Sequence, residues 1–405
     1  MEQKKGKATV AFARPPVICG AASIVGKKES EGPLGPFFDR HIMDDGKGME
    51  NWEQAESSMQ KAAADLSITK AGLKRDDIRY LFAGDLLGQL IATSFGTVDL
   101  EIPLFGLYGA CSTMGEAMSL GAMMVNAGYA DHVLSMASSH FATAEKQFRF
   151  PLAYGNQRPM SSTWTVTGCG AVVIGKEGQP GLAKITAFTA GKAIDIGARD
   201  SMNMGAAMAP AAFHTIEQNL EDLGTDETWY DRIITGDLGE VGTQILLDLM
   251  EKKGRSLKER HMDCGVEIYS KENPRIPHAG GKRLRLFCGY AVRGDPSKNP
   301  GGNLETCSFC AYRRSSFYGK LQRRTDHPGN CPWGGNRAFG IMGEALKAGS
   351  SINKEQIYGL YKSICYRRHY LCSGSDPDGK DETDAGTDHG TVSRFRSHSG
   401  GGRDL

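Results

Sequence analysis

The sequence predicts an α/β fold made of two duplicated halves. Apolar runs of strand length alternate with segments of helical periodicity over residues 1–281, which favours mostly parallel sheets covered by helices on both faces. A helical run, an apolar strand and the tripeptide Gly-Asp-Leu also occur twice in the same order, at Gly84 and again 152 positions later at Gly236. That period is too long for a solenoid repeat, so it indicates two related halves packed about a pseudo-twofold axis.

The first predicted half spans residues 1–178, and its elements follow from local patterns. Strands are expected where short apolar runs are bounded by turn residues, and helices where apolar residues recur at helical spacing. The expected elements are a strand at Thr9–Ala13, a Gly/Pro-rich segment to about Gly48, a helix at Trp52–Ala71 ended by Gly72, a strand at Ile78–Ala83 and a pair of strands within Thr163–Gly175.

The segment around Cys111 carries the functional interpretation. An apolar run, Ile102–Tyr108, leads through a small-residue turn to Cys111, where a helical pattern begins; Gly128 ends it, and His132–Ala137 predicts the next strand. Unpaired N–H groups and the helix dipole stabilise a thiolate at a helix N-terminus, so we expect a lowered pKa for Cys111. The alternative is a buried structural cysteine in a crowded turn.

The second predicted half spans residues 179–281. Its helical run, apolar strand and Gly-Asp-Leu are the second occurrence of the repeat. The expected elements are a strand at Lys184–Ala190, a loop at Asp195–Met208 that is long enough to line a pocket, a helical run over 212–223 and a strand at Tyr230–Thr235.

The two halves are expected to meet at Cys111, with groups from the second half completing a site. Asp85 and Asp237 follow equivalent strands, at the carboxyl ends where α/β sheets gather ligand groups. His261 and Asp263 are candidates for a base or a ligand-orienting pair, since imidazole accepts a thiol proton or hydrogen-bonds a carboxylate near neutral pH. We therefore predict Cys111 and His261 as catalytic residues, and all five as ligand-binding residues. The alternative for Asp85 and Asp237 is that each only caps the following turn.

Composition and charge exclude several classes of function. The net charge of +1 provides no field that would attract nucleic acid or an anionic membrane. We expect no secretory signal, because no apolar run follows the charged first residues, and no apolar stretch has membrane-span length, so membrane association is expected to require a partner. Only four of the ten cysteines precede Gly281, without paired spacing, which is typical of thiols in a reducing compartment. No phosphate, dinucleotide or metal-binding motif occurs there, so neither metal nor cofactor is predicted.

Several stretches of the chain resemble a known family. The segment G-A-C-S-T at 109–113 and the helix after it are similar to the nucleophile segment of the thiolase and ketoacyl-synthase superfamily. More narrowly, the chain resembles the stage V sporulation protein AD family of spore-forming Firmicutes. The matching stretches are E-G-P-L-G at 31–35, F-A-G-D-L-L at 82–87, S-S-H-F-A-T-A-E-K-Q-F-R-F-P at 138–151, A-M-A-P-A-A at 207–212, I-T-G-D-L at 234–238 and H-M-D-C-G at 261–265.

The resemblance, which covers about Ala8 to Gly281, implies a thiolase-like fold and a homodimer. The sporulation family is associated with uptake of dipicolinic acid, as its calcium complex, into the developing spore. The implied protein is cytoplasmic and peripheral to the forespore inner membrane, where it works beside membrane-embedded stage V sporulation proteins. No nucleic acid is an expected partner.

Two departures from the superfamily argue against ordinary acyl transfer. Ketoacyl synthases carry a histidine just after the strand where this chain has Gly236-Asp237-Leu238, and the thiolase Gly-His-Pro motif and second cysteine are not found. The sequence therefore predicts a thiolase fold reused for binding a ligand. The alternative is an acyl-transfer or condensing enzyme that uses Cys111 on a coenzyme A thioester.

After Gly281 the character of the sequence changes, with many basic pairs and six of the ten cysteines. The family continues His-Ala-Gly-Gly with Ser-Gly-Cys-Gly-Cys-Ser-Ala, and one inserted A after the second glycine codon converts plausible codons for that string into Lys282–Gly289 of this chain. We therefore expect residues 282–405 to be out of frame or disordered, which leaves the second half incomplete. The alternative is a zinc module in which Cys307, Cys310, His327 and Cys331 follow a C-x2-C-x16-H-x3-C spacing.

Overall fold

The computed structural model describes residues 2–148, 161, 163–197, 200 and 203–269, with the backbone of short strands at 281–282, 306–312 and 338–345. All of these residues belong to one compact unit, Met1–Tyr366. The helices are α1 Lys27–Ser30, α2 Trp52–Lys70, α3 Ile91–Thr97, α4 Thr113–Asn126, α5 Phe141–Phe148, α6 Met204–Leu223, α7 Gly239–Lys252 and α8 Cys264–Glu267. The strands are β1 Lys4–Lys5, β2 Thr9–Ala11, β3 Val17–Val25, β4 Arg40–His41, β5 Tyr80–Gly84, β6 Leu104–Gly106, β7 His132–Ser139, β8 Trp164–Thr165, β9 Gly168–Gly175, β10 Ala183–Ala190, β11 Ile233–Thr235, β12 His261–Asp263, β13 Gly281–Lys282, β14 Thr306–Tyr312 and β15 Ala338–Ala345.

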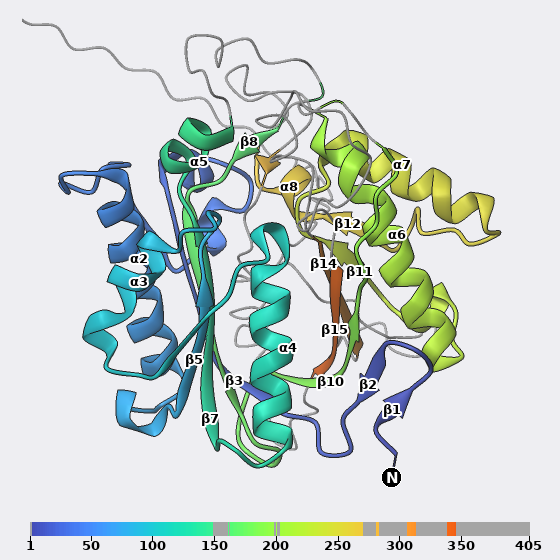
Figure 1. Cartoon of the computed structure of the whole chain (residues 1–405), viewed down its shortest axis with the longest axis horizontal. Coiled ribbons are helices and arrows are strands. Elements are labelled where there is room, and N and C mark those ends of the chain that lie inside the picture. Colours follow the sequence, from blue (N-terminus) through green and yellow to red (C-terminus); the bar gives the residue numbers. More distant parts are fainter. Residues whose placement is uncertain are drawn as a thin grey trace, which may run out of the picture. The chain divides into compact units, whose positions relative to one another are not determined.

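The main sheet repeats one arrangement of five strands (Figure 1). In the order β6-β5-β7-β9-β3, β5 is parallel to β6 and β7, and β9 is antiparallel to β7 and β3. In the order β12-β11-β14-β15-β10, β11 is parallel to β12 and β14, and β15 is antiparallel to β14 and β10. The strands that end at Gly-Asp-Leu, β5 and β11, hold the same place in both sets, so the predicted duplication is confirmed.

The two sets of strands are joined by a short antiparallel pairing of β3 with β10, Ile18 opposite Ala183 and Val17 opposite Lys184. The expectation of mostly parallel sheets is wrong. The sheet is mixed because β9 turns back beside β7, with Ser139 opposite Gly168, and a strand that returns along its neighbour runs antiparallel.

The sequence patterns missed β3, which was assigned to the Gly/Pro-rich segment. Eight of its nine residues are buried, and it lies between β9 and β10. A Cβ on Gly20 would lie 2.4 Å from the carbonyl oxygen of Ser67 in α2, so this glycine lets the helix pack closely on the strand. The glycine and small residues that conceal the strand in the sequence are therefore what permits the packing.

The predicted loop at Asp195–Met208 is shorter than expected, because α6 begins at Met204. The side chain of Asn203 accepts a hydrogen bond from the N–H of Ala206 (3.1 Å) and so caps the helix. The last residues of the predicted loop are therefore helical and contribute Met204 and Met208 to the interior.

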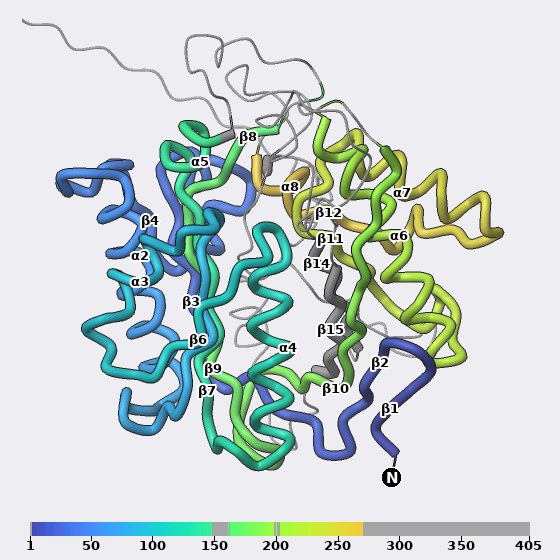
Figure 2. Tube along the Cα trace, viewed as in Figure 1, coloured from blue at the N-terminus to red at the C-terminus, as the bar shows by residue number. Residues whose placement is uncertain are grey.

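Helix α4 lies between the two sets of strands, as Figures 1 and 2 show. It packs on β5, β7 and β9 of the first set and on β14 and β15 of the second. Met114 and Met118 on α4 share one buried cluster with Phe82 of the first half and Ile234 of the second. Helices α2 and α3 lie on the other side of the first set, and α6 and α7 lie beside the second. The residue that begins α4 is therefore placed where both halves meet.

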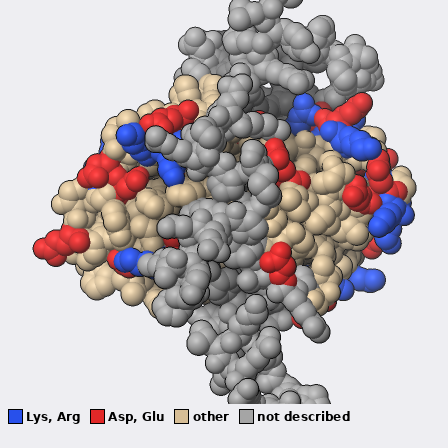
Figure 3. Space-filling model, turned by 90° about the horizontal axis from the view of Figure 1, so that it is seen from above, with Lys and Arg blue, Asp and Glu red and all other residues tan. Residues whose placement is uncertain are grey.

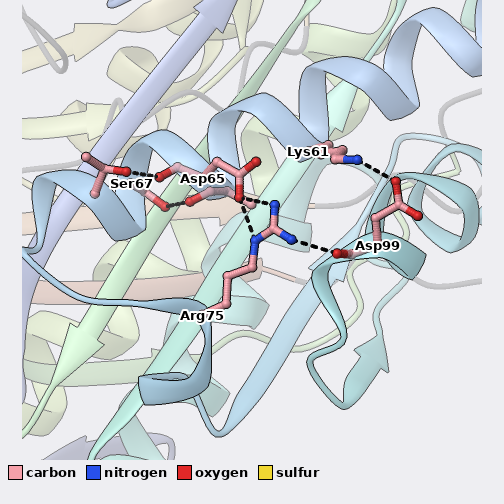
Figure 4. A network of polar contacts seen from close by, with 7 residues as sticks. Lys61, Asp65, Ser67, Arg75 and Asp99 are labelled. Atoms are coloured by element: carbon pink, nitrogen blue, oxygen red, sulfur yellow. Dashed lines mark hydrogen bonds and ion pairs between the residues drawn. The ribbon is translucent and has the colours of Figure 1, made fainter.

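A surface network ties the turn after α3 to α2 (Figure 4). Lys61 on α2 pairs with Asp99, and Arg75 donates through Nε and Nη2 to Asp65 Oδ1 (2.9 and 2.7 Å) and through Nη1 to the carbonyl oxygen of Asp99 (2.8 Å). These side chains are 40% exposed or more, so solvent screens the pairs and each contributes little to stability.

The described surface carries no single-sign field on the face shown in Figure 3, where basic and acidic side chains are interspersed. This agrees with the net charge of +1. None of the helices in the described ranges is long and apolar enough to cross a membrane.

Two strands from the region after Gly281 enter the sheet. Neither β14 nor β15 was predicted from the sequence. His327 and Cys331 of the zinc candidate lie outside the described residues, as do the side chains of Cys307 and Cys310. The out-of-frame hypothesis for 282–405 stays a prediction.

Candidate functional site

Cys111 lies in a single 3-10 turn, Ala110–Ser112, that leads directly into α4. Ala110 has a φ of 43°, a left-handed conformation that costs a non-glycine residue about 1–3 kcal/mol. Thr113 Oγ1 donates to the carbonyl oxygen of Ala110 (3.0 Å) and accepts from the N–H of Gly109 (3.2 Å). The strained residue before Cys111 is therefore held on both sides by the first residue of the helix.

The surroundings of Cys111 come largely from the second half. The residue is 2% exposed and shares a buried cluster with Met204, Met208 and Leu238. Leu238 directly follows Asp237, so the turn after β11 contributes to the same cluster. The structure thus places the predicted nucleophile against the opposing half, whereas the expected lowering of its pKa stays a prediction.

Asp85 caps the turn after β5, which is the alternative role that the sequence left open for this residue. Oδ1 accepts from the N–H of Leu87 (2.9 Å), and Oδ2 accepts from the N–H (3.0 Å) and hydroxyl (2.9 Å) of Thr93. Burial raises the pKa of Asp85 despite these three donors. Its carboxylate fixes the start of α3, and its role as a ligand-binding residue stays a prediction.

Glu56 on α2 is a buried carboxyl group that sequence reasoning missed. Its Oε1 accepts from the hydroxyl of Ser138 (2.6 Å), and its Oε2 accepts from that of Thr143 (3.4 Å). Burial, followed by the charge of Asp85, raises the pKa of Glu56 to about 8. Both acids line a cavity of about 270 Å³ with Thr143 and Lys146. A glutamate in an otherwise ordinary helical pattern gave no signal of this.

Four polar residues of the second half lie in or directly after β11 and β12: Thr235, Asp237, His261 and Asp263. These strands are parallel, with Thr235 opposite Asp263, and Asp237 follows two residues after Thr235. Thr235 Oγ1 lies 2.6 Å from Asp263 Oδ2 and 2.9 Å from His261 Nε2. The predicted His261 and Asp263 pair is therefore connected through Thr235, a residue that sequence reasoning missed.

Asp263 serves as a cap for two helices. Its Oδ2 accepts from the N–H of Leu238 (2.8 Å), and its Oδ1 accepts from the N–H groups of Gly239 (3.0 Å) and Val266 (3.2 Å). Burial raises the pKa of Asp263 to about 7, and the charge of Asp237 adds to the rise. Asp263 thus plays for α7 the part that Asp85 plays for α3.

His261 has its Nε2 engaged by Thr235, whereas its Nδ1 makes no hydrogen bond with any residue of the described ranges. Burial lowers the pKa of His261 to about 4, so the ring is neutral near pH 7. With the carboxylates of Asp85 and Asp263 engaged as caps, Cys111 and His261 stay the predicted groups that would act on a ligand. No group of three or more potential metal-ligating side chains gathers among the described residues.

The duplicated sheet, with a buried cysteine ahead of a central helix, defines the thiolase-like class of proteins. Two solved structures of OleA from Xanthomonas campestris share this fold. The cerulenin-bound form is 13% identical, with a TM-score of 0.50, and covers 82% of this chain and 97% of its own. A variant of OleA in which one histidine is replaced by alanine is 15% identical, with a TM-score of 0.50, and covers 82% and 99%. At such identities the likeness concerns the fold alone.

Within that class, the chain belongs to the stage V sporulation protein AD (SpoVAD) family, whose model matches residues 6–284. It is 42% identical to Stage V sporulation protein AD of Bacillus subtilis (strain 168) over 265 residues, which make up 65% of this chain and 78% of that protein. The family match thus ends near Gly281, where the character of the sequence changes.

Proposed function

We propose that this protein binds dipicolinic acid, free or as its calcium complex, for uptake into the developing spore. Membership of the SpoVAD family supports a role in sporulation. The choice of ligand rests on the position of Cys111. This residue lies in a strained turn at the start of α4 and shares a buried cluster with Met204 and Met208. N–H groups at a helix start attract anionic oxygens, and apolar side chains suit the faces of a flat ring. An aromatic dicarboxylate combines both features.

Under this proposal the protein is a cytoplasmic component, peripheral to the forespore inner membrane, that works beside membrane-embedded stage V sporulation proteins. It binds its ligand without a resident cofactor. We expect acyl transfer to be absent or weak, because the turn after β11 carries Asp237 where ketoacyl synthases carry a histidine.

The proposed assembly is a homodimer that pairs through β6. This strand is the last in the sheet order, with Leu104 39% and Phe105 46% exposed, so its outer edge offers backbone groups and apolar side chains to a second copy. A Phe105→Lys substitution is expected to shift the mass measured by light scattering from dimer to monomer. An unchanged mass would place the interface elsewhere.

Calorimetric titration of the full chain with dipicolinate, with and without calcium, tests the function. Binding is expected, and it should weaken by about tenfold or more in Cys111→Ala. Cys169→Ala is the matched control, since that cysteine is fully buried in a different cluster. Mass spectrometry after incubation with acetyl coenzyme A supplies the opposing outcome: stoichiometric acylation of Cys111 without dipicolinate binding would favour the acyl-transfer enzyme.

A further inference from the structure

A chain of hydrogen bonds runs from His261 through Thr235 to Asp263. Thr235 is fully buried, Asp263 is 3% exposed, and the hydroxyl of Thr235 lies 2.9 Å from His261 Nε2 and 2.6 Å from Asp263 Oδ2. The other acceptor near the hydroxyl, the carbonyl oxygen of Met262, lies 3.5 Å away and is a poor partner. One hydroxyl hydrogen must therefore serve two flanking groups.

The direction of this chain follows from the charge of Asp263. When the carboxylate is ionised it only accepts, so Thr235 donates to Oδ2, and His261 must donate from Nε2 to the oxygen of Thr235. The ring then carries its hydrogen on Nε2 and presents a bare Nδ1. When Asp263 is protonated on Oδ2 it donates to Thr235, which in turn donates to Nε2, so the hydrogen of the neutral ring moves to Nδ1.

We propose that Thr235 is a positioning residue that couples the protonation of Asp263 to the tautomer of His261. Asp263 is poised for this role because its pKa is raised to about 7, while that of His261 is lowered to about 4. Between these values the ring remains neutral, and only the location of its hydrogen changes.

The charge state of Asp263 is set by identifiable neighbours. The titratable groups on the elements around it are Asp237 after β11, Glu240 in the first turn of α7, and Cys264 and Glu267 on α8, with His261 on its own strand. Burial has the largest effect and opposes ionisation of Asp263, and the charge of Asp237 adds to it, whereas the hydroxyl of Thr235 and the N–H groups of Leu238 and Gly239 favour ionisation. The balance of these effects keeps the switch near neutral pH.

The coupling deepens the proposed function and rests on it for its ligand. With Asp263 ionised, Nδ1 of His261 accepts hydrogen bonds and disfavours a carboxylate; with Asp263 protonated, Nδ1 donates and can bind a carboxylate oxygen. An aromatic dicarboxylate that contacts His261 should therefore bind more tightly on the acidic side of the transition.

The tautomer is observable without any ligand. In the full chain labelled with 15N-histidine, the two ring nitrogens of His261 have distinct shifts, assigned by their loss in His261→Gln. We expect the hydrogen on Nε2 at pH 8.5 and on Nδ1 at pH 5.5. Thr235→Val should abolish this exchange, and Thr235→Ser, which keeps the hydroxyl, should retain it. The same tautomer at both pH values in the unsubstituted chain, or a switch that survives in Thr235→Val, would overturn the proposal.

Calorimetry with dipicolinate separates this coupling from the function on which it rests. Affinity should be higher at pH 5.5 than at pH 8.5 by on the order of tenfold, the range of one charge-assisted hydrogen bond, and Thr235→Val should remove the difference. If the tautomer switches but dipicolinate does not bind at either pH, the coupling stands and the proposed function fails. If dipicolinate binds but the tautomer does not switch, the coupling fails and the function stands.

Discussion

Thr113 Oγ1 donates a hydrogen bond to the carbonyl oxygen of Ala110, 3.0 Å away, and so ties the first residue of α4 to the left-handed residue that precedes Cys111. The same oxygen accepts from the N–H of Gly109, and the N–H and hydroxyl of Ser112 add two bonds to the carbonyl oxygen of Gly109. Thr113→Val keeps the shape and removes both bonds. We expect a loss of about 1–3 kcal/mol in the free energy of unfolding, measured by urea denaturation, because a buried N–H and a buried C=O lose their partner.

Thr113→Ser is the matched control, because it keeps the hydroxyl and should remain within about 1 kcal/mol of the unsubstituted chain. If Thr113→Val and Thr113→Ser are equally stable, the hydroxyl does not hold the turn.

Gly109 is predicted to tolerate no side chain. A Cβ there would lie 2.4 Å from Ser112 Oγ and 3.0 Å from the backbone nitrogen of Thr113, so Gly109→Ala should cost about 1–3 kcal/mol of stability through overpacking. Gly236, which directly follows β11 in the second half, has nothing within 4 Å of such a Cβ, and Gly236→Ala should be close to neutral. Thermal unfolding of both variants checks this, and a Gly236→Ala variant as unstable as Gly109→Ala would refute the steric explanation.

Glu56 should make the protein less stable as pH rises. Its pKa is about 8 in the folded chain and near 4.5 when unfolded, so the folded state binds the proton more tightly. Stability is then lost as pH rises from about 4.5 to about 8, on the order of 1 kcal/mol for each unit of pKa shift. Glu56→Gln should therefore raise the melting temperature at pH 9 far more than at pH 5.

Glu53→Gln is the control for that comparison, since Glu53 lines the same cavity but is only half-buried. Its effect should stay within about 0.5 kcal/mol at both pH values. A Glu56→Gln variant whose stability follows the same pH dependence as the unsubstituted chain would contradict the assignment.

The coding DNA is expected to carry one surplus base after the codon for Gly281. Resequencing should show that removal of that base restores the family string Ser-Gly-Cys-Gly-Cys-Ser-Ala. The zinc alternative makes the opposite prediction: an unchanged DNA sequence, with stoichiometric zinc in the purified chain by elemental analysis.

The elements that local pattern predicted best were those whose periodicity is unbroken. Helix α2 begins at Trp52 as expected, and α4 follows Cys111 after one turn. Strand β3 was missed because glycine and small residues suit close contact with α2 rather than a recognisable strand pattern. The antiparallel pairings were missed for another reason: strand direction depends on where the chain returns, which local composition does not encode.

The residues of the candidate site also divide into those that the local sequence predicts and those that it does not. The turn around Cys111 was predictable because its residues are consecutive. Thr235 was not, since its role depends on the register that sets it opposite Asp263, 28 residues further along the chain. Glu56 was missed likewise, because Asp85 and Ser138 approach it only in the folded chain.

The five-strand set β6-β5-β7-β9-β3 is complete within residues 17–175, whereas its counterpart needs strands drawn from 183 to 345. During synthesis, the nascent chain holds every strand of the first set before half of the polypeptide has been made. Domains generally fold as units from the N-terminus onward, so this set can close on the ribosome and offer α4 as a template on which the later strands assemble.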